Sequence, residues 1–109
     1  MRFQKITAVI SLTSVDNVCH TLKHAGVTWI TASQLRGHGE HPVYSERDCM
    51  SSCMRIEIFI EKEKAMDIID LIGRAAYEGE ESEGVIALET IDELFPIKEF
   101  REPQVQSEK

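Results

Sequence analysis

Side chains that bind metals or undergo redox chemistry gather in one stretch of the chain, residues 37–53. Two histidines there, His38 and His41, have H-x-x-H spacing, and two cysteines, Cys49 and Cys53, have C-x-x-x-C spacing. Imidazole and thiolate are ligands that Zn²⁺ and Cu⁺ bind well. The pattern is therefore open to a metal site, to a reversible Cys49–Cys53 disulfide, and to solvated histidines beside half-buried thiols.

A second polar stretch, YEGEESEGV at residues 77–85, contains four glutamates and is flanked by Gly79 and Gly84. Such a composition predicts a loop. The glutamates are either simply solvated or select against highly charged ligands. The chain has no recognisable Ser/His/Asp arrangement, nucleophile motif or phosphate-binding Walker loop, so the sequence does not favour an enzyme.

Two strand-like segments flank the His/Cys stretch and must position it. The segment from Met54 to Glu61 alternates apolar and polar residues, which is typical of a half-buried strand. The segment 27–35 is rich in Thr, Val, Ile and Trp; its Trp29 is expected to pack in the fold, or else to line an interface or a ligand. The intervening loop, residues 38–53, is roughly fifteen residues long, and connections of that length are usually functional or disordered.

The remaining elements follow from the same patterns. Strands are expected at 3–12 and 85–90, and amphipathic helices at 15–25 and 64–77. Thr13 or Ser14 can cap the first helix and Gly26 can end it, while Gly73 inside the second helix is expected to allow close packing. Residues 91–100 predict one helical turn broken at Pro96.

This order of elements, βαββαβ, predicts an α+β, ferredoxin-like fold in which two helices cover one face of a four-stranded antiparallel sheet. Residues 1–100 would form the domain and 101–109 a polar tail. Since Ile56 and Ile58 cannot share the helix-covered face with Phe59, the other face is expected to be partly polar or buried by another subunit. An oligomer is therefore expected.

Size and charge exclude several classes of protein. At 109 residues the chain is long enough for one domain, and its net charge of −7 argues against a nucleic-acid partner. No apolar run is long enough for membrane insertion, and the first residues lack the pattern of a signal peptide. Three cysteines without an export signal fit a cytoplasmic location.

Over residues 3–98 the chain resembles the PII signal-transduction family. KITAVISLTSVDNVCHTLKHAGVTWIT resembles the family's first strand, first helix and second strand, and Leu35–Gly39 (LRGHG) resembles the close of that second strand. MRIEIFIE resembles the third strand. IIDLIGRAAYEGEESEGVIAL resembles the second helix and the glycine-flanked phosphate loop.

The resemblance implies a homotrimer with an adenine-nucleotide site in each intersubunit cleft. The loop 38–53 would project from each subunit and regulate a partner, such as a membrane transporter to which the protein is recruited. Carried over by position, the nucleotide-binding residues would be Thr31, Arg36, Gly37, His38, Gly39, Glu40, Gly79, Ser82, Glu83, Gly84, Val85 and Lys98.

The departures from the family pattern concern charge. Glu40 and Val85 stand where the family has an Arg and a Lys, and bonds to charged groups contribute roughly 1.5–3 kcal/mol each. The effector is therefore expected to be ADP or AMP, with bicarbonate as a further candidate, as in family members associated with carboxysomes or bicarbonate transporters. No cofactor is required. The alternative function is a metal-binding or metal-responsive trimer that uses His38, His41, Cys49 and Cys53.

Overall fold

The structure, a computed structural model, describes residues 2–34, 53–80 and 82–101. The strands are β1 (Phe3–Ser11), β2 (Ile30–Gln34), β3 (Cys53–Glu61) and β4 (Val85–Ile91), and the helices are α1 (Val15–His24) and α2 (Lys62–Ala76). Two short 3-10 turns, η1 (Leu12–Ser14) and η4 (Ile97–Phe100), precede α1 and follow β4. The loop expected at 38–53 and the tail after Arg101 lie outside the described residues, except for Cys53.

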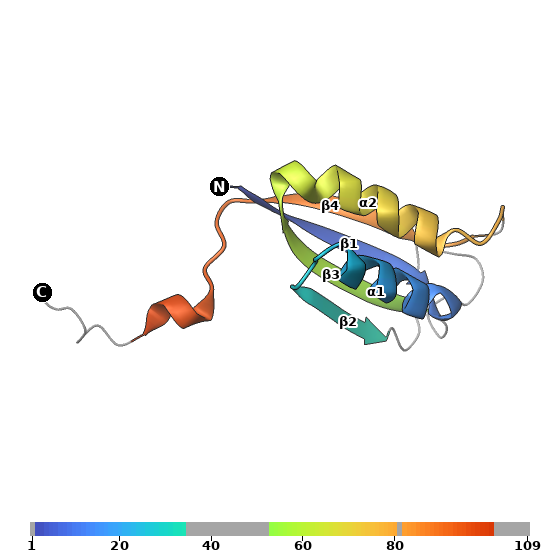
Figure 1. Ribbon diagram of the computed structural model, residues 1–109, viewed down its shortest axis with the longest axis horizontal. Helices are drawn as coiled ribbons and strands as arrows, with labels where there is room; N and C mark the ends of the chain where they lie inside the picture. Colours follow the sequence, from blue (N-terminus) through green and yellow to red (C-terminus); the bar gives the residue numbers. More distant parts are fainter. Residues whose placement is uncertain (1, 35–52, 81, 102–109) are drawn as a thin grey trace, which may run out of the picture.

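The strands form one antiparallel sheet in the order β2-β3-β1-β4, so that β1 and β3 are central and β2 and β4 are the edges. Both helices lie on the same face of this sheet and contact each other (Figure 1). The expected α+β fold, with the element order βαββαβ, is confirmed. Among the described residues, no helix has the length and apolar character needed to cross a bilayer.

The core lies between the helices and the sheet, and it follows from the alternation along the strands. Ile6, Ile58 and Ile30 are paired across three neighbouring strands and point toward the helices; Ile6 and Ile58 are fully buried. The helices contribute apolar stripes at helical spacing. The fully packed members from the helices are Val18, Leu22, Ala65, Ile68 and Ile72.

The other face of the sheet is partly polar, as the sequence predicted. Lys5 Nζ and Glu57 Oε2 are 3.2 Å apart on this face, where both side chains are about one-third exposed. Phe59 also points to this face and keeps 36% of its surface exposed. Val9, by contrast, is almost fully buried, so that the central strand is covered on both sides near its end.

Two local predictions about the helices are corrected by the structure. Ser14 occupies the N-cap position of α1 but makes no side-chain cap hydrogen bond, because its backbone (φ −98°, ψ −9°) is helical rather than extended as in a capping residue. Its hydroxyl donates to Glu78 Oε2 at 2.8 Å and lies 3.3 Å from the Ala76 carbonyl oxygen. Gly73 is not required for close packing: a Cβ there would meet only Ile86 Cδ1 at 3.9 Å, an ordinary van der Waals contact.

The C-terminal turn also differs from its prediction. The helical turn does not straddle Pro96 but follows it, since Pro96 is the N-cap of η4 with extended backbone angles. Proline disfavours helical geometry in the residue before it, which confines the turn to its C-terminal side. At the end of α1 the prediction is confirmed: Gly26 follows the helix with φ of +85°.

Candidate functional site

The glycine-flanked turn between α2 and β4 has a defined backbone conformation. Gly79 and Gly84 have φ of +106° and +113°, values that residues with a Cβ rarely adopt. The Ser82 N–H donates to the Gly79 carbonyl oxygen at 3.0 Å. Gly84 lies so close to β1 that a Cβ would be 2.0 Å from the Val9 carbonyl oxygen. This turn, residues 79–84, therefore requires glycine at both ends. Gly79 is needed for its backbone conformation, and Gly84 is needed both for its conformation and because a Cβ would collide with Val9.

Glu78, just before the turn, connects it to the beginning of α1. Its Oε2 accepts hydrogen bonds from Thr13 Oγ1 at 2.5 Å and from Ser14 Oγ at 2.8 Å, and its N–H donates to Ser82 Oγ at 2.6 Å. The bonds from Thr13 and Ser14 lower the pKa of the Glu78 carboxyl, because they stabilise its charged form. The turn is thus bonded to a segment more than sixty positions earlier in the chain.

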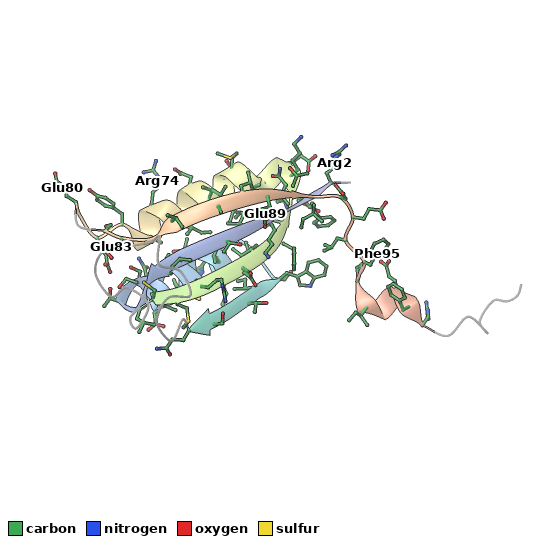
Figure 2. The ribbon with its side chains drawn as sticks, turned by 180° about the vertical axis from the view of Figure 1, so that it is seen from behind. Arg2, Arg74, Glu80, Glu83, Glu89 and Phe95 are labelled. Atoms are coloured by element: carbon green, nitrogen blue, oxygen red, sulfur yellow. The ribbon has the colours of Figure 1, made fainter. Side chains whose placement is uncertain are left out.

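The surroundings of the turn are acidic. Glu80 and Glu83 lie at this end of the molecule (Figure 2), and Val85, 45% exposed, begins β4. Arg74, in the last turn of α2, is engaged by Asp70, with Arg74 Nε 2.8 Å from Asp70 Oδ2, and this hydrogen bond raises the pKa of Arg74. An anion bound at the turn would therefore depend largely on backbone N–H groups.

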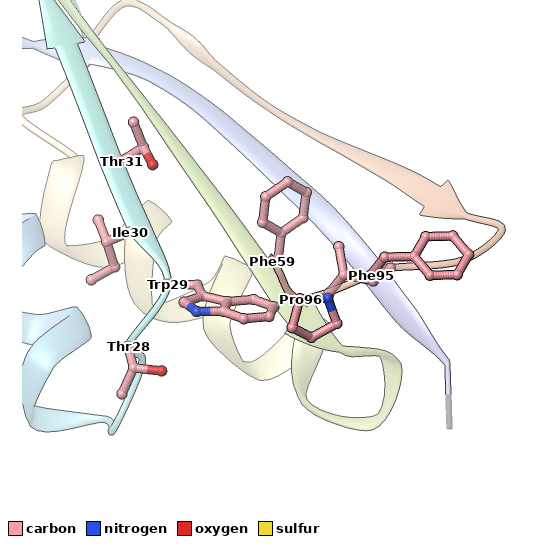
Figure 3. A pocket seen from close by; sticks show the side chains of 8 residues that line it. Thr28, Trp29, Ile30, Thr31, Phe59, Phe95 and Pro96 are labelled. Carbon is pink, nitrogen blue, oxygen red and sulfur yellow. The ribbon is translucent and has the colours of Figure 1, made fainter. Parts of the chain in front are cut away.

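An aromatic pocket lies at the opposite end of the strands. The Trp29 ring contacts those of Phe59 and Phe3, with centroids 6.1 Å and 6.4 Å apart. A pocket of about 330 Å³ opens beside Trp29 and Thr31 (Figure 3), and the segment Leu94–Pro96 after β4 forms its other wall. Its apolar, aromatic lining with a few hydroxyls suits a flat ring system.

The structure brings some of the predicted site residues together and separates others. Gly79, Ser82, Glu83, Gly84 and Val85 are gathered at the turn. Thr31 is exposed on β2, which is the opposite edge of the sheet. Lys98 is exposed in η4, beyond the end of the sheet where Phe95 lies (Figure 2). The predicted residues Arg36, Gly37, His38, Gly39 and Glu40 lie outside the described residues.

The predicted metal set remains a prediction. Cys53, the first residue of β3, is 2% exposed and disulfide-bonded, and His38, His41 and Cys49 lie outside the described residues. Within the part of the chain that the structure describes, no three His, Cys, Asp or Glu side chains are grouped as a metal site would require. His20 and His24 on α1 meet edge to face, with ring centroids 4.2 Å apart and an interplanar angle of 66°.

Sequence reasoning missed Thr13, Ser14 and Glu78 as partners. In the sequence Glu78 is one of several glutamates in a polar loop, and the hydroxyls of Thr13 and Ser14 are candidate helix caps. The signal in the sequence for this interaction is a pair of hydroxyl residues at the start of the first helix and a carboxylate just after the second helix. These groups can be recognised as hydrogen-bond partners only when it is known that the two helices lie side by side (Figure 1).

Comparisons with known proteins cover nearly the whole chain. A family model described as nitrogen regulatory protein P-II matches residues 3–99. Proteins with that name from Microchaete diplosiphon and Synechocystis sp. are each 28% identical over 102 residues, which is 87% of this chain and 91% of each relative. The protein from Nostoc punctiforme is 26% identical over the same shares.

A solved structure gives an independent comparison of the fold. Arabidopsis thaliana PII bound to citrate matches with a TM-score of 0.72 at 24% sequence identity. The match covers 89% of this chain and 84% of the plant protein. At that identity the likeness establishes the arrangement of strands and helices.

Proposed function

Because the chain belongs to the nitrogen regulatory protein P-II family, we propose that it is a regulatory protein that binds an adenine nucleotide, ADP or AMP. The nucleotide occupies a crevice shared by neighbouring copies in a homotrimer. Its binding changes the contact that residues 38–53 make with a regulated partner, for which a membrane transporter is our candidate. The protein acts by binding and needs no cofactor.

The observation that carries this proposal is the aromatic pocket beside Thr31. Thr31 is the residue that the family resemblance assigns to the nucleotide, and Trp29 and Phe59 line the same pocket. Trp29 is 43% exposed, so a large part of its side chain is accessible to a ligand. Stacking of a base on an aromatic side chain contributes roughly 1–3 kcal/mol, which is enough to orient a purine in a pocket of this size.

The turn explains why the nucleotide should carry few phosphates. Val85 offers no cation, and Glu78 and Glu83 add negative charge nearby. Charge-assisted bonds from Lys or Arg contribute roughly 1.5–3 kcal/mol each, whereas backbone N–H groups in a glycine-flanked turn provide neutral donors. AMP and ADP therefore suit this turn better than ATP.

The strand order supports a crevice built from two copies. Thr31 is on β2 and the turn leads into β4, and these are the two edges of the sheet. Three strand spacings, about 14 Å, separate the edges. One chain cannot place both on the same small ligand across its own sheet, but the β2 edge of one copy and the turn of a neighbour can share it.

Trp29 supplies the test, because it is the only tryptophan in the sequence. We expect AMP and ADP to change its fluorescence saturably and ATP to bind more weakly, at fixed protein concentration. Nucleotide at 100 times its dissociation constant should also add about 2.7 kcal/mol to the free energy of unfolding. Bicarbonate and citrate, titrated with and without nucleotide, test whether a small anion binds as well.

Two controls complete the experiment. Trp29→Phe keeps an aromatic ring in the pocket but removes the tryptophan fluorescence. Nucleotide should therefore still raise the unfolding temperature of this variant. Light scattering should give three times the 12.4 kDa mass of one chain. The proposal is wrong if AMP, ADP and ATP all leave both the fluorescence and the unfolding temperature of the wild-type protein unchanged.

A further inference from the structure

The 79–84 turn is anchored at its two ends by different means. At Gly84 the backbone lies directly against the Val9 carbonyl oxygen of β1, so this end is fixed by the sheet. At Gly79 the φ value is unusual, but the space around a Cβ is open for 4 Å. Among the described residues, no backbone contact of the Gly84 kind therefore fixes the Gly79 end, and we infer that its position depends on hydrogen bonds.

Those hydrogen bonds converge on Glu78. One carboxylate oxygen, Oε2, receives both Thr13 Oγ1 and Ser14 Oγ, while the Glu78 N–H reaches Ser82 Oγ inside the turn. Ser14 is only 3% exposed, so its hydroxyl has little access to water as a replacement partner. Thr13 Oγ1 is itself 2.9 Å from Ser11 Oγ, which helps to orient it.

We propose that Glu78 is the positioning residue of the 79–84 turn: it ties Ser82 and the Gly79 end, through Thr13 and Ser14, to the start of α1, so that the turn is preset for an anionic ligand. The ligand part of this inference rests on the proposed function; the mechanical part does not. A bond to a carboxylate is stronger than one between neutral groups. The η1–α1 junction and the turn therefore move as one unit, and a ligand that orders the turn also stabilises the start of α1.

A pair of charge-matched variants tests the inference. Glu78→Ala and Glu80→Ala each remove one negative charge from the same end of the molecule. The Glu80 side chain makes no hydrogen bond or ion pair among the described residues. We expect amide hydrogen exchange in a peptide spanning residues 77–86 to become about tenfold faster in Glu78→Ala, the factor expected for one bond to a charged group, and to stay unchanged in Glu80→Ala.

The donor side provides a second variant that leaves the turn intact. Thr13→Val with Ser14→Ala removes both hydroxyls and should accelerate exchange in the same peptide to a similar extent. Glu78→Gln, which keeps an acceptor oxygen, should lie between the wild type and Glu78→Ala. These variants also decide the question if Glu78→Ala does not fold.

Ligand affinity distinguishes this inference from the proposed function. If AMP or ADP binds the wild type, Glu78→Ala should weaken it about tenfold, whereas Glu80→Ala should bind at least as tightly because it loses a repelling charge. If the wild-type protein binds no nucleotide, the proposed function is wrong, but the hydrogen-exchange data still test the positioning role of Glu78. Equal exchange in Glu78→Ala and Glu80→Ala would overturn the positioning role whatever the ligand does.

Discussion

Gly84 should be the least replaceable of the glycines that the structure describes. Its φ of +113° is unfavourable for any residue with a Cβ, and the added atom would lie 2.0 Å from the Val9 carbonyl oxygen and 3.1 Å from the Val9 carbonyl carbon. Both atoms belong to the backbone of the central strand β1, so no side-chain rotation can relieve the contact. Gly84→Ala must therefore displace either the turn or the pairing of Val9 with Val85.

The magnitude follows from these two effects. A non-glycine residue held in such a region costs about 1–3 kcal/mol, and loss of a backbone hydrogen bond at the start of β4 adds about 1 kcal/mol. The sum is about 2–4 kcal/mol. In a domain of this size each kcal/mol lowers the unfolding temperature by about 4–8 °C, so we expect a decrease of roughly 8–32 °C.

Gly79→Ala is the matched control. Gly79 has nearly the same φ, +106°, but an added Cβ would meet no described atom within 4 Å. Its substitution should therefore cost only the conformational strain, and Gly84→Ala should be the more destabilising by at least about 1 kcal/mol. Urea unfolding followed by circular dichroism, at one protein concentration, measures both. Equal losses in the two variants would refute the argument that the Val9 contact excludes a side chain.

Three further predictions follow from single sites. Gly73→Ala should stabilise the protein by about 1 kcal/mol in the same urea assay, because the helix interior has room for a methyl group; a loss of stability would show that the space is needed. The pKa of Glu78 is lowered in the folded protein. The Glu78 carboxylate therefore contributes its full share to the free energy of unfolding above its unfolded pKa, about 4.3, and this share is lost as the pH falls through the lower pKa of the folded protein. The stability advantage of the wild type over Glu78→Gln should therefore be constant above about pH 5 and shrink below about pH 4, and an advantage that grows on acidification would contradict the assignment. Val85→Lys should raise the affinity for ATP about tenfold to a hundredfold in calorimetry, with the affinity for AMP changing less, and an unchanged ATP affinity would exclude the turn as the phosphate site.

The fold was predictable because its signals are local. Alternation from Met54 to Glu61 and the stripes of both helices determine which side chains face the core, and the register confirms that choice strand by strand. The errors lie where tertiary contacts decide. The Ser14 hydroxyl donates to Glu78 and does not cap the first turn of α1, and Pro96 precedes a helical turn instead of interrupting one.

The site was predictable only in part, for a physical reason. Glycines at positions 79 and 84 mark the turn in the sequence, since backbone conformation there needs them. The hydrogen-bond partners of Glu78 cannot be predicted in this way. A carboxylate in a polar loop is expected to be solvated, and only the tertiary fold brings Thr13 and Ser14 next to it. Leu94–Pro96 likewise gave no sign of forming a wall of the pocket near Trp29.

The two surfaces that we propose for the nucleotide lie apart within one chain. The aromatic pocket is beside Trp29 and Thr31 on the β2 side, and the glycine turn leads into β4 at the other edge and toward the other end of the strands. A nucleotide is apolar and flat at its base and anionic at its phosphates, so it needs both kinds of surface together. Since the sheet separates them by about 14 Å across the strands alone, only a neighbouring copy can bring a turn to the pocket. The strand order therefore makes assembly a condition of the proposed binding, and a ligand bound stoichiometrically by a monomer would have to use the pocket without the turn.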